Sequence, residues 1–285
     1  MLSDGELDAA LDAIRRGLQE DLRYGPDVTT SATVPAGAVA TASMVPREPG
    51  VIAGLDVALL VLDEVVGADA YRVLDRVEDG ARLQPGESLL TVQAETRGLL
   101  TAERTMLNLI CHLSGVATTT AAWVEAVRET KARVRDTRKT LPGLRALQKY
   151  AVRVGGGVNH RLGLGDAALI KDNHVAAAGG VAKAVAAVSS AAPGVPLEVE
   201  CDSLAEVREA LAAGARFLLL DNMPSGELRL AVAEARRYAG VRLEASGGLR
   251  LATAREVART GVDYLAIGAL THSSRALDLG LDFTA

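Results

Sequence analysis

The stretch LEVECDSLAEVREALAAGARFLLLDN, residues 197–222, carries the pattern that decides the fold. It opens with a short strand-like run, continues with an Ala- and Leu-rich helical segment that ends at Gly214, and closes with a second strand-like run. A glycine just after the last helical residue is typical of a helix C-terminus. A strand, a helix and a second strand in this order predict parallel strands joined by a right-handed crossover.

The same alternation extends over the rest of the second half of the chain. Further strand-like runs are VRDT at 134–137, AALIKD at 167–172, RLEASG at 242–247 and YLAIGAL at 264–270, with helical segments such as ATAREVARTG at 252–261 between them. Six strands are fewer than the eight of a complete barrel, so the sequence predicts an α/β barrel that is incomplete or completed by elements from elsewhere. A doubly wound open sheet is the structural alternative.

The first half of the chain is typical of a mixed α+β unit. A helix is predicted from the spacing of Leu7, Leu11, Ile14, Leu18 and Leu22, with Ser3 or Asp4 as its N-cap. Strands are predicted at 38–46 and 71–77, a helix at 54–66, a turn and strand within 81–96, and two separate helices at 99–113 and 116–130.

These patterns predict two domains. We expect an N-terminal α/β sandwich domain of α+β type over residues 1–113, and an α/β-barrel domain over residues 114–285, with the helices at the boundary able to return to the first domain. A chain of 285 residues with 49% hydrophobic residues can bury the cores of both.

The overall charge and the cysteine content exclude several classes of protein. The net charge of −5 argues against general affinity for nucleic acids or for anionic membranes, which both reward a basic surface. Two cysteines are too few for a disulfide framework, and the acidic N-terminus does not resemble a signal peptide. No apolar stretch is long enough to span a bilayer. We therefore expect a cytoplasmic protein without a nucleic-acid or membrane partner.

Charged residues gather at the ends of the predicted strands, where the loops of a β/α barrel converge on one mouth. Glu198 and Glu200 share one face of their strand, so both carboxylates are expected to point into the barrel. Glycine-rich turns at 246–248 and 268–270 follow the last two strands, and their backbone amides suit a phosphate.

A dense basic cluster lies between residues 131 and 174 and predicts a strongly anionic ligand. Its members are Lys131, Arg133, Arg135, Arg138, Lys139, Arg145, Lys149, Arg153, His160, Arg161, Lys171 and His174. Position divides this cluster. Arg133, Arg145, Lys149 and Arg153 fall on or beside predicted helix faces and are expected to be solvated, and the ring of His174 is expected to hold its loop. Strand ends and glycine-flanked loops instead favour a working set of Arg138, Lys139, His160, Arg161 and Lys171.

Several motifs together resemble the quinolinate phosphoribosyltransferase family. They are ERTMLNLICHLSGVAT at 103–118, DTRKTLPGLR at 136–145, QKYAVRVGGGVNHRLGL at 148–164, IKDNH at 170–174, LLDNM at 219–223, EASGG at 244–248 and GVDYLAIGALTHS at 261–273. The resemblance implies a pentosyltransferase of NAD biosynthesis that joins quinolinate to phosphoribosyl pyrophosphate with Mg²⁺. It implies nicotinate mononucleotide, pyrophosphate and CO₂ as products. It also implies a homodimer with shared active sites, for which a hexamer is a further alternative.

The resemblance also implies roles for particular residues. Lys139, Lys171, Glu200 and Asp221 match catalytic positions, and the two acids match positions that hold Mg²⁺, directly or through water. The quinolinate pocket would consist of Thr137, Arg138, Lys139, His160, Arg161 and Lys171, with Arg104 reaching in from the neighbouring subunit. Phosphoribosyl pyrophosphate would contact Lys171, Glu200, Asp221, Ser246, Gly247, Gly248, Gly268, Ala269 and Leu270.

Three other functions remain open at this stage. A phosphoribosyltransferase of the same fold could act on nicotinate or another acid, and would release no CO₂. A barrel isomerase or aldolase could use Lys139 or Lys171 as a Schiff-base amine. A binding module without catalysis is the least favoured, because it leaves the density of charge at the strand ends unused.

Overall fold

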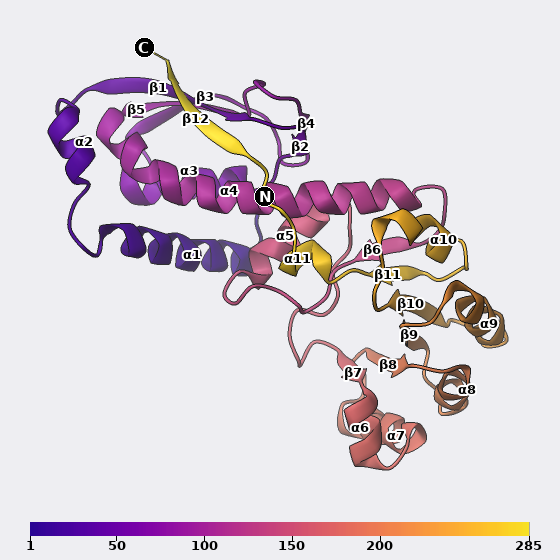
Figure 1. The fold of residues 1–285 in the computed structure, drawn as a ribbon. Coiled ribbons are helices and arrows are strands. Elements are labelled where there is room, and N and C mark those ends of the chain that lie inside the picture. The colour runs from indigo at the N-terminus through magenta and orange to yellow at the C-terminus, as the bar shows by residue number, and fades with distance from the viewer. Residues whose placement is uncertain (285) are drawn as a thin grey trace. The chain divides into compact units, whose positions relative to one another are not determined.

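The computed structural model describes residues 1–284 and divides them into two compact units (Figure 1). The first unit comprises Met1–Ala121, Thr140–Gly156 and the segment from Leu270 to the end of the described chain, and the second comprises Ala122–Lys139 and Gly157–Ala269. Two segments that follow the predicted boundary at residue 114 therefore belong to the first unit. The last of them returns because its strand pairs with the N-terminal sheet.

The first unit is built on an antiparallel sheet with strand order β12-β1-β5-β3 in the described residues. Side chains alternate across it, and Leu90, Val92 and Ala94 of β5 are buried on one face. The strands of this sheet are β1 (Val39–Pro46), β3 (Tyr71–Arg76), β5 (Leu90–Glu95) and β12 (Leu279–Thr284), beside a small pair of β2 (Gly50–Val51) and β4 (Arg82–Leu83).

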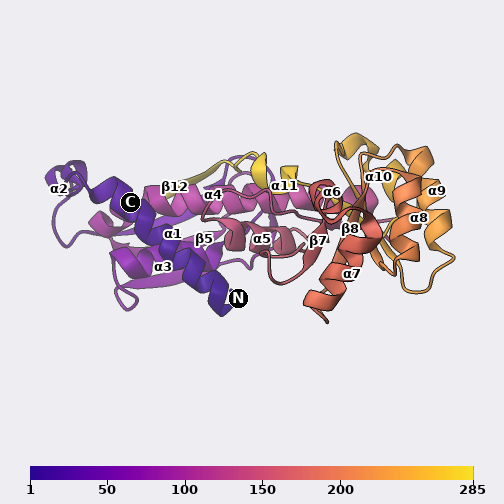
Figure 2. The same ribbon diagram turned by 90° about the horizontal axis from the view of Figure 1, so that it is seen from below.

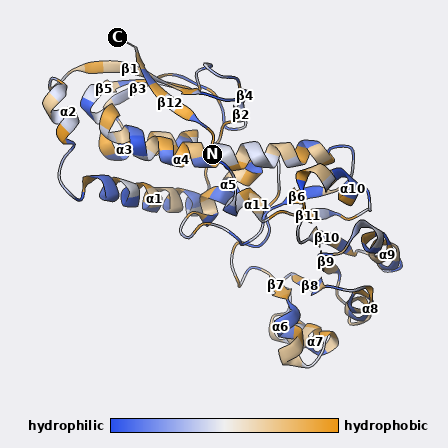
Figure 3. Ribbon diagram, viewed as in Figure 1, coloured by the Kyte–Doolittle hydropathy of each residue, from blue (hydrophilic) through white to orange (hydrophobic). Residues whose placement is uncertain are grey.

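Helices support this sheet, and Figure 3 shows α3 as mainly hydrophobic and α1 as mainly hydrophilic. The amide of Ser3 donates to the Glu6 carboxylate at 2.9 Å, so the first helix begins where the sequence predicts. Asp79 accepts the amides of Gly54 and Leu55 and so stabilises the start of α3. The helices are α1 (Asp4–Leu22), α2 (Val28–Thr33), α3 (Leu55–Val65) and α5 (Arg145–Val154), and α1 packs against α3 and α5.

One prediction for this region is wrong: the helices expected at 99–113 and 116–130 are a single helix, α4 (Thr96–Val127). Gly115 indicated a break, since glycine costs about 1 kcal/mol in a helix interior. The structure shows a different reason for the glycine at this position. A Cβ at this position would lie 2.1 Å from the carbonyl oxygen of Arg275, so the glycine lets a second backbone approach the helix.

Gly115→Ala is therefore expected to destabilise the first unit strongly. The new methyl group must displace backbone, which costs about 3 kcal/mol or more and corresponds to a fall in Tm of roughly 6–12 °C. Thermal denaturation followed by circular dichroism measures it. Gly5→Ala is the matched control, since a Cβ at Gly5 of α1 meets no atom within 4 Å. Equal Tm values for the two variants would refute this role of Gly115.

The second unit contains a parallel sheet of strand order β6-β11-β10-β9-β8-β7 in the described residues. Five strands lie within one or two residues of the predicted ones, and the sixth, predicted at 264–270, ends four residues earlier. The strands are β6 (Arg133–Arg135), β7 (Ala168–Ile170), β8 (Leu197–Cys201), β9 (Phe217–Asp221), β10 (Arg242–Ser246) and β11 (Tyr264–Ala266). Successive strands from β7 to β11 are neighbours without a reversal of order, which excludes a doubly wound sheet. Beyond β6 a bridge joins Arg135 to Val158. The predicted α/β class with an incomplete barrel is confirmed.

Short helices follow the strands and pack against one another in chain order from α6 to α10 (Figure 2). They are α6 (Asp172–Ala178), α7 (Val181–Ala191), α8 (Leu204–Ala212), α9 (Ser225–Ala235) and α10 (Ala254–Ala258), with a 3₁₀ turn at Leu251–Thr253 before the last and α11 (Ala269–His272) after β11. Within residues 1–284 no single helix has the length and apolar composition to cross a membrane, and the bent pair α6 and α7 passes that test jointly.

Candidate active site

A cavity of about 370 Å³ opens at the carboxyl ends of the strands of the second unit. Successive side chains of a strand point to opposite faces of the sheet. In β8, Glu200 therefore faces the cavity, whereas Val199 and Cys201 are fully buried on the other face. The lining residues are Thr137, Arg138, Lys139, His160, Arg161, Leu169, Lys171, Glu200, Leu219, Asp221, Glu244, Ser246 and Ala266.

Nine residues proposed from the sequence meet in this cavity: Thr137, Arg138, Lys139, His160, Arg161, Lys171, Glu200, Asp221 and Ser246. Gly247 and Gly248 follow Ser246 directly, and Gly268 and Ala269 follow β11. Leu270 has a fully buried side chain, so its backbone amide is the group left for phosphate binding. Arg104 is exposed on α4, in the first unit.

The cationic side chains of the cavity, which we call its cationic side, come from the loop after β6, the loop at 160–161 and the residue that follows β7. The hydroxyl of Thr137 accepts the amide of Lys139 at 3.0 Å and so shapes the turn after β6. The guanidinium of Arg161 donates to the carbonyl of Ala167 at 3.0 Å. Burial and the nearby charge of Arg138 lower the pKa of Arg161. Two guanidinium groups that repel each other are ready to bind an anion, because the anion relieves that repulsion.

Two acidic side chains, which we call the acidic side of the cavity, lie at the ends of β8 and β9, and one of them contacts a lysine of the cationic set. Lys171 forms an ion pair with Glu200 across neighbouring strands, and Asp221 accepts the side-chain amide of Asn222 at 2.6 Å. Asn222 has a φ of 54°, the only positive value outside glycine in residues 1–284. Such strain commonly marks a functional loop.

The glycine-rich turn after β10 approaches this strained loop closely. The amide of Asn222 donates to the carbonyl of Ser246 at 2.9 Å. A Cβ at Gly247, whose φ is +86°, would lie 2.2 Å from the side-chain oxygen of Asn222. Only glycine fits there, and the turn leaves its backbone open to an anionic ligand.

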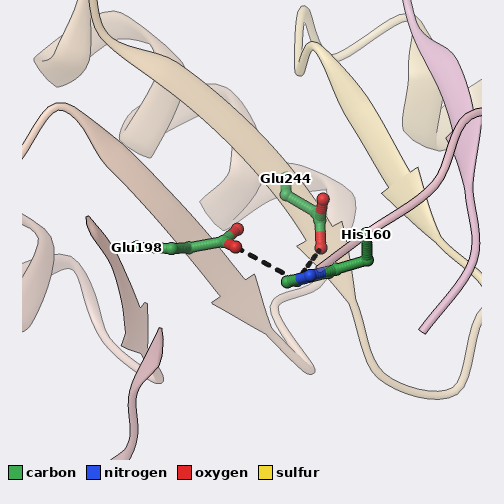
Figure 4. A group of neighbouring side chains, drawn as sticks. All are labelled: His160, Glu198 and Glu244. Atoms are coloured by element: carbon green, nitrogen blue, oxygen red, sulfur yellow. Dashed lines mark ion pairs between the residues drawn. The ribbon is translucent and has the colours of Figure 1, made fainter. Parts of the chain in front are cut away.

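At the floor of the cavity lie His160, Glu198 and Glu244, all buried (Figure 4), and the partly buried Arg135 contacts the two acids; we call these four residues the floor network. Nε2 of His160 lies 3.1 Å from Glu198 and 3.6 Å from Glu244, and Nη1 of Arg135 lies 2.6 Å from Glu244. Burial raises the pKa of both carboxyl groups far above their usual range, although the charge of Arg135 opposes it. The network therefore tends to hold a proton.

Arg135 is a residue whose importance the sequence prediction missed. Its guanidinium contacts the rings of both Phe217 and Tyr264, at 5.0 and 5.2 Å from their centres. The sequence contained a signal for its inward position: Arg135 precedes Thr137 by two residues and therefore shares the face of the strand that points into the barrel. By the same rule, Glu244 shares the inward face with Ser246.

The residues predicted to be idle have different outcomes. Arg133 is exposed as expected, and Arg153 pairs with Glu6 at 2.5 Å. The prediction that Lys149 is solvated is wrong, because Leu147–Val152 of α5 are all buried and this helix has no free face there. Nδ1 of His174 accepts the amide of Lys171 at 2.9 Å, so its ring holds the loop as predicted.

Two groups of residues could be considered for a metal ion. Glu200 and Asp221 offer carboxylate oxygens on the wall of the cavity, the donors that Mg²⁺ prefers. His160, Glu198 and Glu244 also bring ligand atoms within 4.8 Å of one another. However, the amide of Arg161 donates to Nδ1 of His160 at 2.7 Å, so the ring proton lies on Nε2. A protonated Nε2 has no lone pair for a cation, and the floor network does not suit a metal.

Comparisons with known proteins agree in both halves of the chain. Residues 27–114 match the model of the N-terminal domain of quinolinate phosphoribosyl transferase, and residues 116–282 match its C-terminal domain. The chain is 70% identical to the nicotinate-nucleotide pyrophosphorylase (carboxylating) of Mycobacterium leprae over 283 residues, 99% of this chain and 100% of the relative.

Two solved structures have the same fold over nearly the whole chain. NadC from Streptococcus pyogenes is 39% identical with a TM-score of 0.91, covering 100% of this chain and 99% of that one. The nicotinate-nucleotide pyrophosphorylase of Francisella tularensis is 38% identical with a TM-score of 0.91, covering 97% and 96%.

Proposed function

The chain belongs to the quinolinate phosphoribosyltransferase family, and from that membership we propose how its own residues divide the work of the reaction. It transfers the phosphoribosyl group of phosphoribosyl pyrophosphate to quinolinate in NAD biosynthesis. The products are nicotinate mononucleotide, pyrophosphate and CO₂. The proposal depends on one observation: a single cavity is lined both by cations from the loops next to β6 and β7 and by carboxylates at the ends of β8 and β9.

The cationic side binds quinolinate in this proposal. Arg138 and Arg161 each offer the fork of donors that a carboxylate accepts in pairs, and Lys139 and Lys171 add compact charges. Two carboxylates on adjacent ring carbons need several donors from different directions, which these residues supply from three separate loops. His160 completes the wall between them.

The acidic side and the glycine turns hold phosphoribosyl pyrophosphate. Ser246, Gly247 and Gly248 present a turn of backbone amides for the 5′-phosphate, together with Gly268, Ala269 and the amide of Leu270. Glu200 and Asp221 line the same cavity, where their carboxylates would accept hydrogen bonds from the ribose hydroxyls. The Lys171 and Glu200 pair then lies at the junction of the two substrates.

Mg²⁺ fits the carboxylates of Glu200 and Asp221, either directly or through water. When bound, it would neutralise charge on the pyrophosphate as that group departs. Glu200 remains available for such a role because Lys171 is close to one of its two oxygens, Oε2.

The mechanism requires mainly positioning and electrostatic stabilisation by this chain. Departure of pyrophosphate gives the ribose oxocarbenium character, which the fixed charges of Glu200 and Asp221 stabilise. Arg138, Arg161 and Lys139 hold the ring nitrogen of quinolinate against the anomeric carbon despite the repulsion between two anions. The nitrogen becomes a pyridinium, whose positive charge stabilises the carbanion left on the adjacent ring carbon when the carboxylate departs as CO₂. A proton from water then adds to that carbon and completes nicotinate mononucleotide. Lys171 acts as an ammonium cation paired with Glu200, which does not suit a Schiff-base amine.

A homodimer with shared active sites belongs to the same proposal. Arg104 is exposed on α4, and the next residue, Thr105, lines a groove of about 400 Å³ between α1, α4 and the loop at 142–144. A groove of this size beside an exposed arginine supports docking of a second copy that would receive Arg104 in its pocket. We also place the enzyme in the cytoplasm, for which two free cysteines are suitable.

The purified chain is expected to form nicotinate mononucleotide and CO₂ from quinolinate and phosphoribosyl pyrophosphate when Mg²⁺ is present. Chromatography of the nucleotide and release of ¹⁴CO₂ from carboxyl-labelled quinolinate measure the two products. Chelation with EDTA should abolish both, and nicotinate in place of quinolinate should give none. Full activity in EDTA would exclude the role of Mg²⁺, and turnover of nicotinate would contradict the proposed use of both substrate carboxylates.

A further inference from the structure

The floor network explains more than the packing beneath the cavity. Glu198 and Glu244 are 4% and 0% exposed, and one oxygen of each, Oε1, has no hydrogen-bond partner among the described residues. Two carboxylates buried in this way beneath an anion-binding pocket are costly, and apolar side chains of similar size would be cheaper. Their presence therefore calls for a role in the site itself.

His160 connects these carboxylates to the pocket wall. Its Nδ1 accepts the amide of Arg161 at 2.7 Å, which places the ring proton on Nε2. Nε2 then donates to Glu198 at 3.1 Å, with Glu244 next to it at 3.6 Å (Figure 4). Without these acceptors the Nε2 tautomer would lose its advantage, and Nδ1 would no longer be kept free for the amide of Arg161.

The remaining contacts of this loop depend on the same anchor. The amide of His160 donates to Asp136 at 2.7 Å, and the side chain of Asn159 donates to the other oxygen of Asp136 at 2.6 Å. Farther along, Asp166 accepts the amides of Leu162 and Gly163 at 2.6 and 2.8 Å. Arg161 lies between the segment bound by Asp136 and the segment bound by Asp166, and its own backbone amide is bound by the His160 ring.

Arg135 fixes the carboxylates in turn. It donates to Glu244 at 2.6 Å and lies 3.8 Å from Glu198, and its place is set by the rings of Phe217 and Tyr264. The chain of contacts thus runs from a rigid arginine through two acids and one imidazole to the backbone of Arg161.

We propose that Glu198 and Glu244 are positioning residues for the acidic substrate: they hold His160 in the tautomer that anchors the Arg161 backbone, and so determine where the Arg161 guanidinium lies in the pocket. This inference rests on the assignment of quinolinate to the cationic side of the cavity. Supporting groups of this kind commonly change affinity or activity 10- to 100-fold when they are removed.

A double-mutant cycle tests the inference. Glu198→Met keeps a similar volume and removes both the charge and the acceptor oxygens, and is expected to raise KM for quinolinate about 10-fold while KM for phosphoribosyl pyrophosphate changes less than about twofold. In an Arg161→Ala background the same change should have little further effect, because the side chain to be positioned is gone. Glu227→Met, on the exposed surface of α9, is the matched control and should change neither constant.

Nuclear magnetic resonance gives a readout that does not depend on activity. The chain has four histidines, and a His160→Gln variant assigns the ring signals of His160 in ¹⁵N-histidine-labelled protein. Its Nδ1 should carry no proton in the parent protein, and Glu198→Met, which removes the acceptor of the Nε2 proton, should shift the ring toward the other tautomer.

Three results would overturn the inference. These are a protonated Nδ1 in the parent protein, an equal rise in KM for quinolinate from Glu198→Met with and without Arg161, or equal rises in KM for both substrates. Should Glu198→Met fold poorly, Glu244→Met enters the same cycle with the same expectations. Loss of turnover in Arg161→Ala with an unchanged KM for quinolinate would instead count against the proposed quinolinate pocket, so the two failures can be told apart.

Discussion

Arg138→Ala is expected to lower kcat/KM for quinolinate by about 10²- to 10³-fold while leaving the fold intact. Arg138 lines the cavity beside Arg161, and the two charges are near enough for Arg138 to lower the pKa of Arg161. Without Arg138, one substrate carboxylate enters a partly dehydrated pocket without its bidentate partner. Steady-state kinetics with each substrate varied in turn measure the loss, and circular dichroism checks the fold.

Arg133→Ala is the control for this experiment, because Arg133 is exposed at the start of β6, the strand that precedes the loop of Arg138. A kcat/KM for Arg138→Ala near that of the parent would reject the assignment of Arg138. The variant also tests the shared site. Mixed and reassociated with Arg104→Ala subunits, it should restore about a quarter of the parent activity, because half of the dimers are mixed and each has one complete site.

Glu200→Gln should lower kcat by about 10²- to 10³-fold with little change in KM for quinolinate. The carboxylate lies on the acidic wall with Asp221 and pairs with Lys171, so its charge acts where the ribose becomes cationic. Loss of one of two oxygen ligands should also raise the Mg²⁺ concentration needed for half-maximal rate. Rate measurements over a Mg²⁺ titration give both quantities.

Asp202→Asn is the matched control for Glu200, since Asp202 is an exposed acid two residues farther along the chain and does not line the cavity. Glu200→Asp should recover part of the rate, because it keeps the charge. An unchanged kcat in Glu200→Gln, or an equal loss in Asp202→Asn, would contradict a role for Glu200 in the transition state.

Alternation along single strands predicted much of the site. The alternation of side chains along a strand predicted that Glu198 and Glu200 share the inner face of β8. In the structure, Glu200 lies in the cavity wall and Glu198 in the floor network. The same alternation predicts that Arg135 points inward, but the sequence of this short, arginine-rich strand does not show which arginine is enclosed. Arg135 is enclosed because the rings of Phe217 and Tyr264, from two distant strands, pack against it.

Helix α4 shows the opposite limit of sequence reasoning. The sequence predicted two helices on either side of position 115, because the helix propensity of glycine is low and is all that the sequence shows at one position. The structure keeps the helix continuous, because the backbone near Arg275 packs against it in space. Lys149 is a similar case, since periodicity predicts a helix but not that α5 is enclosed over Leu147–Val152.

The sequence by itself determined the α/β class, the six parallel strands and the charged residues at their ends. These depend on periodicity and on turn residues, which act between near neighbours in the chain. Only the tertiary structure decided which of those charges meet. Arg138, Lys171, Glu200 and Asp221 come from four strands, and the distances between their side chains are set by strand pairing and by burial, which involve residues far apart in the chain.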